Sequence, residues 1–113
     1  MLVNLRGFKS KEVSLKKVLK QERPNILLLN ETQLAGKVKV SLPAYKCWSK
    51  NRTEKGGGGV ATGVSKEYMD SAVGVGEGEE EDEFIITRIE QFNPALNIIN
   101  CYGEQRKSRK EEV

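Results

Sequence analysis

The chain has 113 residues, a formal net charge of +3 and no histidine. Because an average domain has roughly 150 residues, we expect a single folding unit. Leucine, isoleucine, valine and phenylalanine make up about a quarter of the chain, above the ~20% typical of disordered chains, so a modest core is expected. The missing histidine excludes a histidine zinc ligand, a histidine general base and a Ser–His or Cys–His nucleophile pair within these residues.

The cysteines and the apolar runs indicate the cellular setting. Cys47 and Cys101 are too few for a disulfide framework, and neither lies in a C-x-x-C motif. The polar Asn4 and Arg6 follow the first three residues at once, unlike a signal peptide. The longest apolar run, Ile26–Leu29, is far too short to span a membrane. We therefore expect a reducing, intracellular setting, in the nucleus or cytoplasm, and no membrane.

Charge is distributed unevenly along the chain. Residues 1–66 hold 14 lysines and arginines against 4 acids, whereas residues 67–113 hold 5 against 12. The six acids within residues 77–83, interleaved with and preceded by glycines, are interpreted as a mobile surface loop. Alternatively, they repel nucleic acid from one edge of the molecule. The basic half alone would fit a sequence-independent nucleic-acid binder whose affinity falls with salt.

The first 30 residues predict strand, helix, strand. Residues 1–4 are apolar and partly β-branched, and Ser10 is a candidate N-cap with Glu12 in the first helical turn. Pro24 ends the helix, because the residue before proline is excluded from the α region. Residues 25–29 then suit a strand buried on both faces. The apolar residues expected on the buried helix face are Leu15, Val18 and Leu19, with Val13 as a further candidate.

The remainder of the chain predicts β-structure. The expected strands are residues 45–49, 59–65, 84–90 and 96–102, of which the last two form a hairpin. Residues 56–59, all glycine, are expected to form a flexible turn. Ser108 and Glu111 form a capping box, so the sequence is expected to stop just inside a helix.

Two polar residues lie at the ends of the first two predicted strands. Asn4 ends the first strand and Glu31 follows the second, and in an open α/β sheet the carboxyl ends of neighbouring parallel strands border the ligand crevice. A lone carboxylate there suits Mg²⁺, which takes one or two protein carboxylates and keeps several waters. Asn30 is expected on the opposite face from Glu31. The alternative is that Glu31 only caps the loop after the strand.

A basic segment precedes the glycine run. Lys50, Arg52 and Lys55 would form a mobile tip able to contact a phosphate backbone, although a solvated turn explains them equally well. The glycine run is no Walker loop, because no Gly-Lys-Ser/Thr follows it. Trp48 is expected in the core rather than stacked on a base.

Taken in order, these motifs resemble the endonuclease/exonuclease/phosphatase superfamily. The motifs are Asn4-x-x-Gly7, the segment Pro24–Leu34, the run Gly57–Gly59 and the strand Ile98–Tyr102. They are most similar to the apurinic-type endonuclease domains of non-LTR (LINE-type) retrotransposons. The resemblance implies a DNase I-like, two-sheet α/β sandwich with a mixed sheet and one clear helix. It also implies hydrolysis of phosphodiesters in nucleic acid, in DNA rather than RNA, with magnesium or manganese.

The resemblance also implies roles for three residues. Asn4 matches the asparagine that contacts the scissile phosphate, Glu31 the magnesium-binding glutamate, and Tyr102 the tyrosine that hydrogen-bonds near the phosphate. This chain departs from the family at Arg6, where some members carry an acid. It departs again after Tyr102, where Gly-Glu replaces the usual small residue or proline.

Family domains are longer than this chain and consist of two similar α/β halves whose sheets pack face to face. Their Asp-x-Asn and Ser-Asp-His motifs lie in the second half, and neither motif occurs here. Residues 1–113 are therefore expected to be the first half of such a nuclease, inactive alone. The alternative is a catalytically dead half-fold that binds a partner. Its exposed sheet face would then be covered by a second copy or by a complementing second half.

Overall fold

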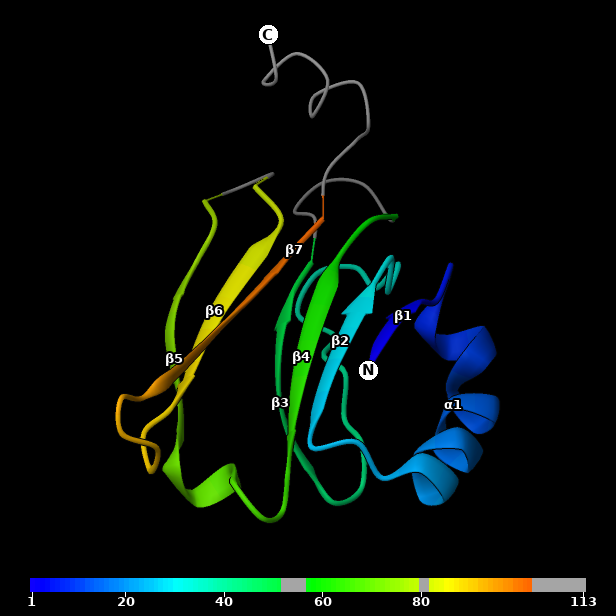
Figure 1. Ribbon diagram of the computed structural model, residues 1–113. Helices are drawn as coiled ribbons and strands as arrows, with labels where there is room; N and C mark the ends of the chain where they lie inside the picture. The colour runs from blue at the N-terminus through cyan, green and yellow to red at the C-terminus, as the bar shows by residue number, and fades with distance from the viewer. Residues whose placement is uncertain (52–56, 80–81, 103–113) are drawn as a thin grey trace, which may run out of the picture.

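The computed structural model describes residues 1–51, 57–79 and 82–102. This part of the chain forms one helix and seven strands, with a short 3₁₀ turn between the fourth and fifth strands (Figure 1). In chain order these elements are β1 (Leu2–Asn4), α1 (Phe8–Glu22), β2 (Ile26–Asn30), β3 (Tyr45–Lys50), β4 (Val60–Ser65), η1 (Met69–Ser71), β5 (Ala72–Glu77), β6 (Phe84–Ile89) and β7 (Leu96–Cys101).

The strands form two sheets. The first has the order β1-β2-β4-β3, in which β1 and β2 are parallel and the other pairs antiparallel. The second has the order β5-β6-β7 and is antiparallel throughout. The predicted architecture, two sheets with one mixed and a single helix, is confirmed, as are the expected strands near residues 1–4, 25–29, 45–49, 59–65, 84–90 and 96–102.

Helix α1 begins earlier than predicted. Gly7, with φ of 116°, is the N-cap, so Ser10 lies inside the helix and the predicted cap was wrong. The cause is Phe8, which is buried and whose backbone N–H donates to the Thr32 carbonyl oxygen at 2.8 Å. Val13 is 71% exposed and Val18 40% exposed, so neither belongs to the buried face. The helix ends before Pro24, as predicted, with a left-handed Arg23 as its C-cap.

Two apolar clusters hold the layers together. The first lies between α1 and the first sheet and includes Leu27 and Leu29, together with residues of the segment 34–42. The second lies between the two sheets, where Ile26 and Leu28 pack against residues of β4, β5, β6 and β7. Because alternate residues of β2 enter different clusters, β2 is covered on both faces, as the apolar run predicted.

The second cluster also corrects an expectation about exposed surface. We expected the inner face of a single sheet to lie open, but this chain contributes strands to both sheets, and their inner faces pack on each other. Asn100 of β7 adds a polar link across them. Its Nδ2 donates to the Ala61 carbonyl oxygen at 2.8 Å and to Thr62 Oγ1 at 3.3 Å, both in β4.

Strand β5 was missed because its glycines and acids looked like a loop. It pairs with β6 through a bulge between Gly74 and Gly76, and Glu77 is its last residue. A Cβ at Gly74 would lie 2.9 Å from Nε1 of Trp48, so glycine is needed for this close approach. Trp48 is half-buried and packs against the inter-sheet cluster, consistent with its predicted place in the core.

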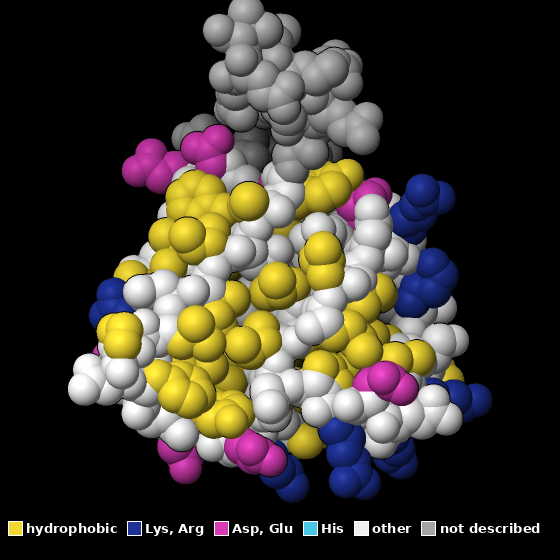
Figure 2. Space-filling model, in the orientation of Figure 1, with side chains coloured by type: hydrophobic (Ala, Val, Ile, Leu, Met, Phe, Trp, Pro, Cys, Tyr) yellow, Lys and Arg dark blue, Asp and Glu magenta, His cyan; other side chains and the backbone are white. Residues whose placement is uncertain are grey.

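The uncovered surface lies along two strand edges. Strands β1 and β7 each end the order of their sheet, and β7 packs over β2 and β4 rather than over β3. Leu2 of β1 is 67% exposed and Ile99 of β7 is 62% exposed. Figure 2 shows further apolar side chains on this side of the molecule.

Within the described part of the chain, no helix is long and apolar enough to cross a membrane. The predicted capping box at residues 108–111 lies outside the described residues.

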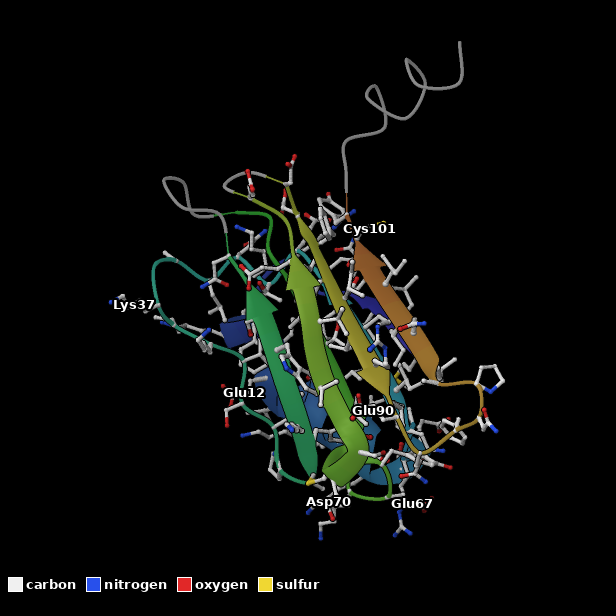
Figure 3. The ribbon with its side chains drawn as sticks, turned by 90° about the vertical axis from the view of Figure 1, so that its left-hand side faces the viewer. Glu12, Lys37, Glu67, Asp70, Glu90 and Cys101 are labelled. Atoms are coloured by element: carbon white, nitrogen blue, oxygen red, sulfur yellow. The ribbon has the colours of Figure 1, made fainter. Side chains whose placement is uncertain are left out.

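The two cysteines provide a simple chemical test of this packing. Burial raises the pKa of the Cys47 thiol, although a hydrogen bond with the backbone of Leu42 acts in the opposite direction. Cys101 is exposed, at the upper end of β7 in Figure 3. Since the thiolate is the reactive form, a disulfide reagent at pH 7–8 should label Cys101 rapidly and Cys47 slowly. Cys101→Ser should abolish the rapid phase, and equal rates at both thiols would contradict the packing of β3.

Candidate functional site

The parallel pair β1 and β2 brings the predicted Asn4 and Glu31 to one edge of the first sheet. Asn4 is the register partner of Asn30, and the pairing continues past both strands. The Leu5 N–H donates to the Asn30 carbonyl oxygen at 3.0 Å, and the Gly7 N–H donates to that of Glu31 at 2.9 Å. The backbone of Glu31 is therefore fixed directly beside the turn that leads into α1.

The register of β1 and β2 differs from the expectation in which face of the sheet Asn4 occupies. Register partners share a face of the sheet, so Asn4 lies on the same face as Asn30, the face that packs toward the second sheet at Leu28. We had expected Asn4 and Glu31 to share a face, with Asn30 on the other. The alternation stops at Glu31 because its backbone is left-handed, with φ of 53°. Asn4 is exposed, whereas Glu31 and Asn30 are half-buried.

The glycine run closes the other side of this edge. The Thr32 N–H donates to the Gly59 carbonyl oxygen at 3.3 Å, and the Gln33 N–H donates to that of Gly58 at 2.8 Å. Glu31 thus belongs to a segment clamped between residues 5–8 and residues 57–59. Gly58 and Gly59 are buried, so the expected flexible turn is, at residues 57–59, a packed part of the site. Gly56 lies outside the described residues.

Unusual backbone geometry is concentrated here. A left-handed or otherwise strained backbone persists only where the surroundings enforce it, and such positions cluster at functional sites. Three of the five non-glycine residues with positive φ among those described, Arg6, Glu31 and Gln33, lie on these three segments.

Glu83 is a site residue that sequence reasoning missed. It is only 9% exposed, and its Oε1 accepts a hydrogen bond from the Gly59 N–H. Its carbonyl oxygen accepts one from the Tyr102 N–H at 3.0 Å. Glu83 therefore joins the glycine run to the end of β7, where Tyr102 lies half-buried. Its acidic neighbours concealed it, because they gave the whole tract the appearance of a solvated loop. The one available signal was its position directly before the apolar strand that starts at Phe84.

The predicted basic tip is only partly visible. Lys50 is the last residue of β3, pairs with Val60 and is 7% exposed, so its assignment to a mobile tip was wrong. Arg52 and Lys55 lie outside the described residues. Contact of these three side chains with a phosphate backbone stays a prediction.

The residues on either side of Glu31 in the sequence carry side-chain oxygens of the kind that hard cations bind. Asn30 Oδ1 and Thr32 Oγ1 are buried and have no hydrogen-bond partner among the described residues. These residues contain no cluster of three or more Asp, Glu, His or Cys that could hold a metal ion. A carboxylate in a segment with so few other acidic ligands fits Mg²⁺ or Mn²⁺ bound mainly by water and substrate, and does not fit a closed protein cage.

The close packing of residues 57–59 against Thr32 predicts that alanine substitutions at two glycines differ sharply in their effect on stability. A Cβ at Gly59 would lie 2.4 Å from Thr32 Oγ1, and the φ of Gly59 is +91°. Gly36 has a φ of +61° but nothing within 4 Å of such a Cβ. Gly59→Ala should therefore lower the free energy of unfolding by about 3 kcal/mol, and Gly36→Ala by only about 1 kcal/mol. Urea denaturation measures both. Equal losses would show that the contact with Thr32 has no effect.

The fold is a two-sheet α/β sandwich with polar residues gathered at the carboxyl ends of a parallel strand pair. Among solved structures it is similar to the crystal structure of the AP endonuclease LMAP from Leishmania major, with a TM-score of 0.75 and 17% identity over 99% of this chain and 43% of that one. It is also similar to the 3′ phosphatase NExo (D146N) from Neisseria bound to a product DNA hairpin, with a TM-score of 0.63 and 19% identity over 98% and 46% of the two chains. The chain thus spans less than half the length of either structure. No protein-family model and no curated protein matches the sequence.

Proposed function

We propose that this chain is the N-terminal half of a metal-dependent phosphodiesterase or endonuclease that acts on nucleic acid, DNA rather than RNA. The observation that carries the proposal is the clamped edge at Glu31. There the backbone around Glu31 is fixed by hydrogen bonds from both neighbouring segments at the carboxyl ends of two parallel strands, the first of which ends at Asn4. The fold shared with an AP endonuclease and with a DNA-bound 3′ phosphatase supports it.

Each residue would have a distinct task in such a site. The Glu31 carboxylate would hold Mg²⁺ or Mn²⁺, with Asn30 Oδ1 as a nearby oxygen donor. The ion would supply a Lewis acid for a phosphoryl oxygen. The exposed Asn4 amide would donate to a phosphate oxygen, and Tyr102 would hydrogen-bond near it. Glu83, through Gly59, is a positioning residue that keeps the glycine run against the Glu31 segment.

The sequence contains no histidine that could activate water at this site. In-line attack on phosphorus needs an oriented nucleophilic water and a group that takes its proton. We propose that the second half of a full-length enzyme supplies this group, so that the chain binds metal and phosphate but does not cleave alone.

A nicking assay on supercoiled plasmid with Mg²⁺ tests whether the chain needs a second half for cleavage. We expect no cleavage above the buffer control from the chain alone. Magnesium-dependent nicking that is abolished in Glu31→Ala but retained in Glu90→Ala, an exposed acid on another loop, would show that these residues suffice and that the half-site account is wrong.

The unpaired edges favour a second candidate function, that of a half-fold that binds a partner. Exposed strand edges with apolar side chains promote association, and Leu2 and Ile99 provide such a surface on β1 and β7. A second copy related by two-fold symmetry is the simplest occupant; a complementing second half would cover the same edges. Light scattering should then give a dimer or a larger species for the isolated chain, whereas a folded monomer at high concentration would exclude self-association.

A further inference from the structure

A hollow of about 910 Å³ lies at the end of the molecule opposite Glu31, where α1 ends. Its floor is apolar and includes Leu19 of α1 and the segment Pro43–Tyr45 that leads into β3. The Tyr45 hydroxyl donates to the Pro24 carbonyl oxygen at 2.6 Å, which fixes the ring. The volume lies within the range of pockets for small organic ligands.

The rim of this hollow is basic. The four cationic residues that line it are Lys16, Lys20, Arg23 and Lys66, and none of its lining residues is acidic. Figure 2 shows Lys and Arg side chains along this lower edge of the molecule. Among the described residues only Lys16 of the four is in an ion pair, with Glu12 at 2.8 Å. The other cations outweigh the partial negative charge of the carbonyl groups that end α1.

We propose that this groove, defined by Leu19, Tyr45 and the four cations, binds an aromatic organic phosphate of nucleotide size. The apolar floor and the basic rim together require a ligand that is both apolar and anionic. A bare anion would satisfy the rim and leave the apolar floor in water, whereas a neutral aromatic ring would cover the floor and leave the cations unpaired. A nucleotide has a flat base for the floor and a phosphate for the rim. The nucleotide is either free or part of a single strand.

The test is a titration of the ¹⁵N-labelled chain with deoxyadenosine monophosphate, followed through backbone amide shifts. The expected shifts are at Lys20, Arg23 and Tyr45 and not at Glu31. Deoxyadenosine, which lacks the phosphate, and deoxyribose 5-phosphate, which lacks the base, should each bind about tenfold more weakly or worse. If deoxyribose 5-phosphate or inorganic phosphate binds as well as the nucleotide, the groove is only an anion patch and the proposal is wrong.

Variants confine the effect to the groove. The double variant Lys20→Ala/Lys66→Ala should weaken nucleotide binding about tenfold, whereas Lys9→Ala/Lys17→Ala, which removes two exposed lysines of α1 outside the lining, should leave it unchanged. Thermal unfolding of both checks that they fold. An octadeoxyadenylate distinguishes the two sources of the nucleotide. If it binds at least tenfold more tightly than the monophosphate and is equally sensitive to the variants, the ligand is part of a single strand. If the two bind with equal affinity, the ligand is the free nucleotide. Shifts outside the groove only, or equal binding by both variants, would overturn the proposal.

Discussion

Replacing Asn100 by aspartate should destabilise the protein by about 3 kcal/mol at pH 7. Asn100 is 2% exposed, and its Nδ2 donates to the Ala61 carbonyl oxygen and to Thr62 Oγ1 across the two sheets. An aspartate carboxylate cannot donate, and it would place a buried negative charge against a carbonyl oxygen. The loss is large because a small domain is stabilised by only 5–15 kcal/mol in total.

This variant also has a predictable pH dependence. Burial would raise the pKa of Asp at this position above its unfolded value of about 3.9. The unfolded state would then lose its proton first as the pH rises, so the variant should become less stable, relative to the natural protein, from pH 4 to pH 7. Urea unfolding at both pH values, with Asn100→Ala as the uncharged control, measures the difference. A pH-independent loss identical to that of Asn100→Ala would contradict the buried position of this side chain.

Replacing Leu27 by alanine is expected to cost about 3 kcal/mol. Leu27 is fully buried between α1 and the first sheet, where its neighbours include Leu15, Leu19 and Leu29. Removing three carbon atoms there leaves a cavity that the surrounding strands cannot fill without distortion. Val13, on the same helix that covers Leu27, is 71% exposed. Val13→Ala should therefore change the free energy of unfolding by less than about 0.5 kcal/mol. Similar effects of the two substitutions would contradict the orientation of α1.

Local sequence signals predicted most of the fold because they reflect local physics. The apolar run in β2, the proline after α1 and the β-branched pair β6 and β7 each restrict the backbone within a few residues. The predicted start of α1 was wrong because a long-range contact determines where the helix begins. The Phe8 N–H bonds to Thr32, 24 residues further along the chain. The location of β5 was hidden for a similar reason. Its Gly74 makes room for Trp48, and nothing in the residues around this glycine indicates that neighbour.

The sequence predicted the two site residues at the strand ends but not the contacts that surround them. Asn4 ends β1 and Glu31 directly follows β2, and their position at one sheet edge required only that those strands be parallel and adjacent. The left-handed backbone of Glu31 was not predictable, because segments on both sides of it in space impose it. Glu83 was missed because burial of a carboxylate depends on its partner, and Gly59 precedes it by 24 residues.

The central claim is that the Glu31 edge binds a divalent cation, and paramagnetic broadening by Mn²⁺ tests it most directly. Substoichiometric Mn²⁺ should broaden the amide signals of Leu5, Thr32 and Gly59 first, and excess Mg²⁺ should restore them. Glu31→Gln should abolish the broadening at these amides. Glu90→Gln should leave it unchanged, because Glu90 follows the end of β6 that bonds to Ser71, whereas Glu83, before the other end of β6, is the residue that reaches Gly59 and the Glu31 segment. Broadening that is confined to the acidic tract around Glu79, or that persists in Glu31→Gln, would contradict the account.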